Sequence, residues 1–234
     1  MSEILTKVTQ IFEQAQQKRV FPGGVVWLSN GKVLLHQAFG QTTYGDEGDL
    51  LPAQNVRPEM LYDLASITKL FTTTAVLMNA EKHDISLDKP IANFLLPFQK
   101  DIYNKITLRH LLQHSSGLEI AVQSLKDQKH TEWISLIADA PLHAQPGETV
   151  KYSCTNFFLL ARILELWTDT PTDQWITANI LQPLEMTRSN YRPQKYFSLD
   201  DIVPTEIDPE TNKPWHGIVH DEAARSWQQQ TGST

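Results

Sequence analysis

Cysteine is almost absent from this sequence, which has 234 residues and a single thiol at Cys154. One thiol cannot form an internal disulfide or a thiolate metal cluster. No run approaches the roughly 18 consecutive apolar residues that span a membrane, and the first residues, Met-Ser-Glu-Ile-Leu-Thr-Lys, lack the apolar segment of a signal peptide. We therefore expect a soluble, cytoplasmic protein without a membrane partner.

Basic residues are also few. Lys and Arg number 20 against 27 Asp and Glu, which gives a net charge of −7, and the basic residues form no stripe. Nucleic-acid binding is therefore not expected. Internal repeats and low-complexity tracts are lacking as well. The length and the 41% hydrophobic content suffice for one large domain or two small ones with a real core.

Three Ser-x-x-Lys sequences are present, where residue usage predicts about one by chance. Ser29-Asn-Gly-Lys32 spans an Asn-Gly step between two alternating apolar runs, which predicts a hairpin turn. Ser86-Leu-Asp-Lys89 is followed by a proline and predicts a solvated linker. Only Ser66-Ile-Thr-Lys69 stands at the head of an apolar run with the length of a buried helix.

The Ser66 pair has the geometry that nucleophilic catalysis needs. Residues three apart at the start of a helix share a face, so Lys69 can reach the Ser66 hydroxyl. A serine attacks only if a base takes its proton, and a lysine amine is such a base only if burial lowers its pKa well below about 10.4. We expect the apolar neighbours of Ser66 to supply that burial, namely Leu64, Ala65, Ile67, Leu70 and Phe71. A helix cap beside a surface lysine is an equally good interpretation of these residues alone.

The pattern along the chain predicts helices joined to one hairpin. Apolar spacing predicts helices over residues 3–18, 66–81, 108–114, 132–139, 157–167 and 173–186, and alternation predicts a hairpin over 23–40. After Arg192 prolines and acids dominate, so we expect mostly loop and no closing element in the polar end from Trp227. This order indicates an α+β fold.

Several segments, in the same order, resemble the serine β-lactamase and penicillin-binding protein superfamily. Asp63-Leu-Ala-Ser66-Ile-Thr-Lys69 resembles its nucleophile motif. Ile106-Thr-Leu-Arg-His-Leu-Leu-Gln-His-Ser-Ser-Gly-Leu118 and Pro146-Gly-Glu-Thr-Val-Lys-Tyr152-Ser-Cys resemble the branch of class C β-lactamases and family VIII carboxylesterases. The resemblance implies one β-lactamase-like domain over 1–234, an antiparallel sheet with flanking helices and a helical region over about 66–190.

Two departures from the family pattern affect the implied site. Cys154 stands at the third position of a Tyr-x-Asn motif, where the family often has asparagine, and Asn156 could substitute only if the backbone stayed extended there. The third motif, Lys/His-Thr/Ser-Gly on a strand, has no match after Tyr152. The resemblance therefore implies that three strands and a final helix are missing and that the domain is C-terminally incomplete.

The resemblance implies a serine hydrolase that forms an acyl-enzyme on Ser66. Lys69 and Tyr152 would move protons, and Cys154 and Asn156 would contact a small ester or amide substrate. No metal or organic cofactor is implied, and the oligomeric state is unknown. The alternatives are a D-alanyl-D-alanine carboxypeptidase-like enzyme, a catalytically impaired penicillin-binding protein and a non-catalytic binding protein.

A metal site is a further alternative. His110 and His114 have the four-residue spacing of two ligands on a helix, and His216, His220 and Asp221 could add more. No glutamate follows His110 as in zinc proteases, so structural roles for the histidines are favoured.

Overall fold

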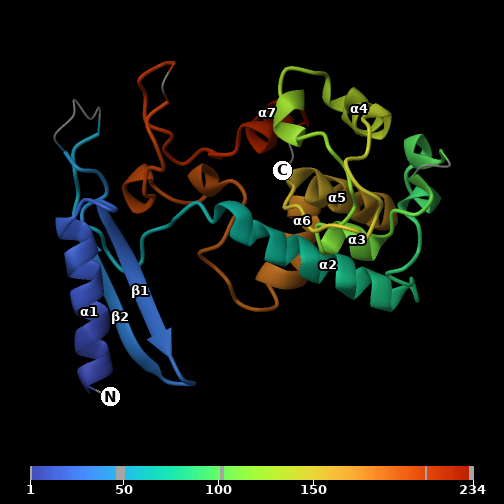
Figure 1. The fold of residues 1–234 in the computed structure, drawn as a ribbon. Coiled ribbons are helices and arrows are strands. Elements are labelled where there is room, and N and C mark those ends of the chain that lie inside the picture. Colours follow the sequence, from blue (N-terminus) through green and yellow to red (C-terminus); the bar gives the residue numbers. More distant parts are fainter. Residues whose placement is uncertain (1, 46–50, 101–102, 209, 232–234) are drawn as a thin grey trace. The chain divides into compact units, whose positions relative to one another are not determined.

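The computed structural model describes residues 2–45, 51–100, 103–208 and 210–231 (Figure 1). The chain divides into two compact units, Met1–Asp63 with Arg192–His220 and Leu64–Tyr191 with Asp221–Thr234. The single domain predicted for residues 1–234 stays a prediction.

The first unit is built on a helix and a hairpin. It contains α1 (Ser2–Gln17) and the antiparallel strands β1 (Gly23–Ser29) and β2 (Val33–Gly40). These bounds confirm the predicted first helix and the predicted hairpin. The turn between the strands includes Gly31 at φ +96°, a left-handed conformation that glycine adopts without steric cost.

Aromatic packing holds α1 on the hairpin. The ring of Phe12 lies 5.1 Å from that of Phe39 on β2 and 5.9 Å from that of Phe21. Residues 192–220 return to this unit, where Arg57 donates to the carboxylate of Asp201 at 2.8 Å. The hairpin therefore gains partners, which two strands alone need in water.

The second unit is helical. It contains the 3₁₀ turn η1 (Ala65–Ile67), followed by α2 (Thr68–Lys82), α3 (Leu108–Leu112), α4 (Trp133–Asp139), α5 (Cys154–Thr168), α6 (Thr172–Ile176) and α7 (Glu222–Thr231). Helices and a small antiparallel sheet together confirm the α+β class.

The core of this unit surrounds α5, which Figure 1 shows among α2, α3 and α6. The fully buried side chains of α5 lie one helical turn apart on one face, which packs against buried apolar residues of α2 and α3. They are Leu159, Leu160, Ile163 and Leu164, and the residues facing them include Ala75, Val76, Leu108 and Leu111. This packing brings the N-terminal ends of α2 and α5 together.

One prediction about this unit is confirmed in part and one is wrong. The α-helix predicted over 173–186 ends at Ile176 and continues as a π-helical turn, Thr177–Leu181. The polar end does contain a closing element, α7, which carries few apolar residues and so gives a weak pattern. Its Trp227 lies 5.4 Å from the ring of Trp133 and 5.1 Å from that of Phe158, and these contacts hold the helix.

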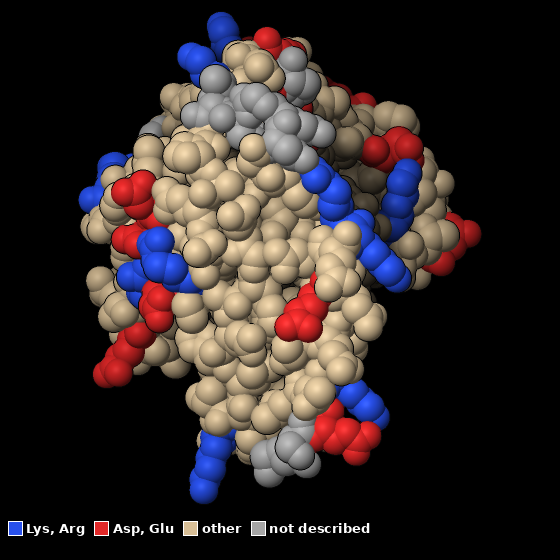
Figure 2. Space-filling model, turned by 90° about the vertical axis from the view of Figure 1, so that its left-hand side faces the viewer, with Lys and Arg blue, Asp and Glu red and all other residues tan. Residues whose placement is uncertain are grey.

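Figure 2 shows the charged side chains of one face. Lys and Arg lie there in several groups, some of them beside Asp or Glu. Among the described residues, no helix combines the length and the apolar character needed to cross a membrane.

The packing of α7 gives a testable expectation. Trp227→Ala should lower the free energy of unfolding by about 2 kcal/mol, less than for a fully buried tryptophan because Trp227 is half-buried. Denaturant unfolding measures the change. Gln229→Ala, on the exposed side of the same helix, should change it by less than about 0.5 kcal/mol. Equal effects of the two substitutions would show that α7 is not packed.

Candidate active site

Ser66 lies in η1, directly before α2 rather than inside it as predicted. The preceding residue, Ala65, has φ +45°, a left-handed conformation that is costly for a residue with a Cβ atom. The amide groups at the start of a helix lack intrahelical partners, and negative charge is favoured there. The strained backbone thus presents the Ser66 hydroxyl at the positive end of a helix.

The structure brings together the three residues predicted to be catalytic. Ser66 Oγ lies 2.6 Å from the hydroxyl of Tyr152, and Lys69 Nζ donates to Ser66 Oγ at 3.2 Å. Lys69 reaches the serine from one turn along the chain, whereas Tyr152 is 86 residues away and arrives through the packing of α5 on α2. A hydroxyl in this position can pass its proton to an unprotonated amine or to a phenolate.

The surroundings of the Lys69 amine are sulfur and aromatic rings. Its Nζ lies 3.6 Å from Cys154 Sγ, 5.0 Å from the ring centre of Tyr152 and 5.7 Å from that of Phe157. Within the described residues, no carboxylate forms an ion pair with Lys69. A thiol is a weak acceptor, so the Ser66 hydroxyl is the stronger of the two hydrogen-bond partners of the amine.

The burial expected from the neighbouring apolar residues is mostly wrong. Leu64, Ala65, Ile67 and Leu70 are exposed, Leu70 by 65%, and only Phe71 of the five is partly buried against the core. The buried face of α2 instead begins at Thr72 and continues through Ala75, and Leu70 lies on another face of the helix. Lys69 itself is half-buried, because the start of α5 covers it.

Cys154 and Asn156, predicted to contact substrate, point in different directions. Both belong to α5, where residues two apart project about 200° from each other. Cys154 faces Lys69. Asn156 is buried, with only 1% of its surface exposed, and its side-chain oxygen accepts from the Ser116 hydroxyl at 2.6 Å. The backbone is helical rather than extended, so the placement of Asn156 disagrees with the predicted substrate contact.

His114 adjoins the site, a position that the sequence interpretation missed. Its ring centre lies 4.6 Å from that of Tyr152 and 5.1 Å from that of Phe157. Its Nδ1 accepts from the Ser153 amide at 3.1 Å, a bond that only the unprotonated nitrogen can accept. Burial, followed by the positive charge of Lys69, lowers the pKa of His114 below its ordinary value. The neutral ring, with its proton on Nε2, is therefore favoured.

The remaining histidines of the metal alternative have other partners. The Nδ1 of His110 accepts from the Thr107 amide at 3.2 Å, which completes the N-terminal cap of α3. In the first unit, the Nε2 atoms of His216 and His220 lie 2.7 Å from the carbonyl of Ile202 and 2.5 Å from the carboxylate of Glu206. The described residues contain no group of three His, Cys, Asp or Glu that could hold a metal ion.

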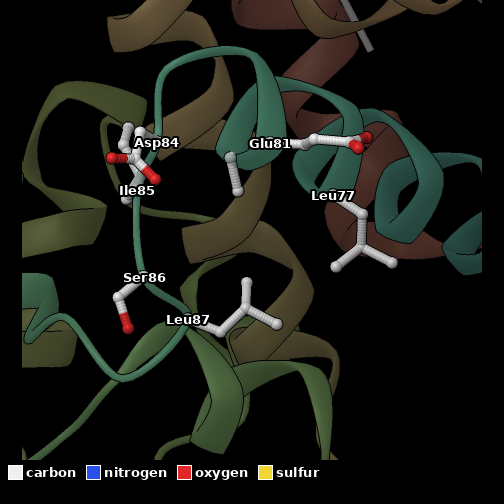
Figure 3. Close-up of a pocket in the computed structure, with 7 residues that line it drawn as sticks. Leu77, Glu81, Asp84, Ile85, Ser86 and Leu87 are labelled. Carbon is white, nitrogen blue, oxygen red and sulfur yellow. The ribbon is translucent and has the colours of Figure 1, made fainter.

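The other two Ser-x-x-Lys sequences behave as predicted. The Ser29 hydroxyl donates to the backbone carbonyl of Lys32 in the hairpin turn, at 3.1 Å. The hydroxyl of Ser86 accepts from the Asp88 amide at 3.2 Å in the linker after α2. Ser86 also lines an open pocket with residues from the end of α2, and Figure 3 shows this pocket with Leu77 and Glu81 on the helix. No candidate catalytic residue lines that pocket.

Comparison with known sequences assigns the family. Residues 8–210 match the sequence model of the family described as Beta-lactamase. This chain belongs to the beta-lactamase family. Membership confirms the resemblance noted from the motifs and makes the chain serine hydrolase-like.

Three similar proteins add to this finding. Protein flp of Staphylococcus aureus (strain NCTC 8325 / PS 47) is 29% identical over 221 residues, which cover 89% of this chain and 43% of that protein. A solved class C beta lactamase has a TM-score of 0.74 at 19% identity and covers 95% of this chain and 60% of its own. EstCE1, described as a hydrolase with promiscuous acyltransferase activity, has a TM-score of 0.73 at 21% identity, with 92% and 59% covered.

These structural likenesses confirm the predicted β-lactamase-like fold. This chain spans less than two thirds of the length of each of these relatives. The catalytic roles of Ser66, Lys69 and Tyr152 stay predictions, because a shared fold does not assign chemistry.

The strain at Ala65 can be measured. Ala65→Gly should raise the free energy of unfolding by about 0.5 to 1 kcal/mol, because glycine adopts a left-handed conformation without a Cβ penalty. Ala75→Gly, the same chemical change inside α2, should lower it by about 1 kcal/mol or more. Chemical denaturation of both variants provides the test. A destabilised Ala65→Gly protein would contradict the left-handed conformation.

The lowered pKa of His114 predicts a loss of stability in acid. The imidazole of the unfolded chain takes up a proton near its ordinary pKa of about 6.5, whereas the folded ring resists it, because burial and then the positive charge of Lys69 lower its pKa. The contribution of His114 is therefore complete above pH 6.5 and is lost as the pH falls below that value toward the folded pKa.

Denaturant unfolding between pH 5 and 8 tests this sign. The stability difference between the unaltered protein and His114→Asn should shrink as the pH falls through this window. The control is His36→Asn on the exposed side of β2, which leaves His114 in place. A difference that grows in acid would contradict the prediction.

Proposed function

We propose that this chain is a serine hydrolase that forms an acyl-enzyme on Ser66. The observation that carries the proposal is the position of Ser66 Oγ, 2.6 Å from the Tyr152 hydroxyl and 3.2 Å from Lys69 Nζ. Both distances fall within or close to the range over which a proton is transferred. Membership of the beta-lactamase family supports the same reaction class.

The first step forms a covalent intermediate. Ser66 Oγ bonds to the carbonyl carbon of the substrate while its proton passes to the unprotonated amine of Lys69 or to Tyr152 in its phenolate form. The tetrahedral intermediate collapses, the bond to the alcohol or amine breaks, and that leaving group takes the proton. Water then attacks the acyl carbon, loses a proton to the same pair and releases a carboxylic acid, and Ser66 recovers its hydrogen.

Charge stabilisation comes from the start of the helix. The oxyanion of the tetrahedral intermediate can accept from the Ser66 backbone amide, in η1, at the positive end of α2. Once Lys69 has accepted the serine proton, its ammonium adds a positive charge on the same side of the serine. A single amide donor of this kind typically contributes about 10²- to 10³-fold in rate.

A small ester is the substrate class that these residues support best, with a cytoplasmic location proposed alongside it. Tyr152 is 57% exposed and Ser66 is exposed, so a carbonyl can approach both hydroxyls. At Cys154 the chain has a thiol, whereas an asparagine at this position would have an amide that can bind a substrate amide. A thiol is a weak hydrogen-bonding group, so it favours an amide substrate less. The hydrolase description of EstCE1, which shares the fold, is consistent with an ester substrate.

Intact-protein mass spectrometry tests the acyl-enzyme. Incubation with p-nitrophenyl acetate, and separately with benzylpenicillin, should add one acyl mass to the protein. Ser66→Ala should abolish the addition, and Lys69→Ala should slow it by about 10²- to 10⁴-fold, as loss of a general base does. The matched controls, Ser29→Ala and Ser86→Ala, alter the other two Ser-x-x-Lys sequences and should leave it unchanged.

The result also separates the alternatives. Release of acetate after labelling favours an esterase, whereas stable labelling by benzylpenicillin alone favours a penicillin-binding protein. An unlabelled protein, or labelling that survives Ser66→Ala, would refute the proposed mechanism and favour a binding function.

A further inference from the structure

His114 contacts the chain on both sides of the candidate phenol. The Lys151 amide donates to the backbone carbonyl of His114 at 2.8 Å, and the Ser153 amide donates to His114 Nδ1 at 3.1 Å. Between these two bonds the ring of His114 lies against that of Tyr152, with centroids 4.6 Å apart and planes inclined by 39°. One residue thus fixes the backbone before and after Tyr152 and also contacts its ring.

His114 is itself held by the buried core. It follows α3 with φ +56°, so its backbone turns sharply there. The amide of Asn156 lies 3.4 Å from His114 Nδ1 and is oriented by the Ser116 hydroxyl, 2.6 Å from its oxygen. The ring of Phe157 lies 5.1 Å from that of His114. These contacts connect the end of α3 to the start of α5.

Tyr152 needs such support, because its side chain is mostly exposed. Within the described residues, the hydrogen bond of its hydroxyl is to Ser66, and ring contacts restrict the rest of the side chain. An exposed tyrosine without a fixed ring samples several rotamers, and most of these carry the hydroxyl away from Ser66.

We propose that His114 is a positioning residue that holds the Tyr152 phenol within proton-transfer distance of Ser66. The inference rests on the proposed function, since it concerns the group that exchanges a proton with the nucleophile. His114 acts through Tyr152 and needs no contact with the substrate. Its ring restricts the phenol, and its Nδ1 and carbonyl oxygen fix the backbone.

The first measurement requires no activity. Biosynthetic incorporation of 3-fluorotyrosine gives one ¹⁹F signal for each tyrosine, and the spectrum of Tyr152→Phe identifies the Tyr152 signal by its loss. That signal should be shifted in His114→Ala, toward the position of an unrestrained tyrosine. His114→Asn should show a smaller shift, because asparagine retains a hydrogen-bond acceptor and tolerates positive φ. His110→Ala, on the neighbouring turn, should leave the signal unchanged.

The second measurement is kinetic, with p-nitrophenyl acetate as the substrate. His114→Ala should lower kcat by about 10- to 100-fold, as misplacement of a catalytic group does, with little change in KM. His114→Asn should recover part of the loss. In a Tyr152→Phe background, His114→Ala should cause little further loss, because the group on which it acts is already absent.

The outcomes separate the two proposals. Full activity of His114→Ala, or an equal loss in the Tyr152→Phe background, would overturn the positioning role and leave the acyl-enzyme intact. Absence of acylation in the unaltered protein would refute the proposed function, and the ¹⁹F signal of Tyr152 would still decide the positioning role. If His114→Ala does not fold, as judged by circular dichroism, His114→Asn in both backgrounds decides it.

Discussion

The packing of α2 against α5 is the constraint on which the candidate site depends. Ser66 and Lys69 belong to the start of one helix, Tyr152 and Cys154 to the start of the other, and apolar contacts farther along both helices hold these ends together. Side chains such as Val76 and Leu160 take no part in the proposed reaction, but their burial holds the two helices together and so places Tyr152 beside Ser66. A hydrogen bond of 2.6 Å between residues 86 apart is a consequence of the core.

The surroundings of the Lys69 amine follow from the same packing. In the described residues the amine is surrounded by a hydroxyl, a thiol and two aromatic faces. Residues at and near the start of α5 supply the thiol and both aromatic faces. When charged, Lys69 disfavours a second positive charge on His114.

Much of this arrangement could be predicted from local patterns. Strand alternation around Asn30-Gly31 indicated the hairpin, and helical spacing indicated α1, α2 and α5 to within a few residues. Long periodic segments carry such signals because apolar residues recur at the spacing that places them on one buried face of the helix or strand. The helix α7 is polar apart from Ala223, Ala224 and Trp227, so its composition indicated loop, although the aromatic contacts of Trp227 hold it.

The sequence by itself determined the α+β class and set Ser66 and Lys69, at the head of an apolar run, apart from the other two Ser-x-x-Lys sequences, since both depend on neighbours along the chain. Tertiary structure alone decided the exposure of Leu70, the burial of Asn156 and the contact between His114 and Tyr152. The physical reason is that these features depend on how α2, α3 and α5 pack together in space. Contacts between helices distant in sequence leave no periodic signal in any one of them.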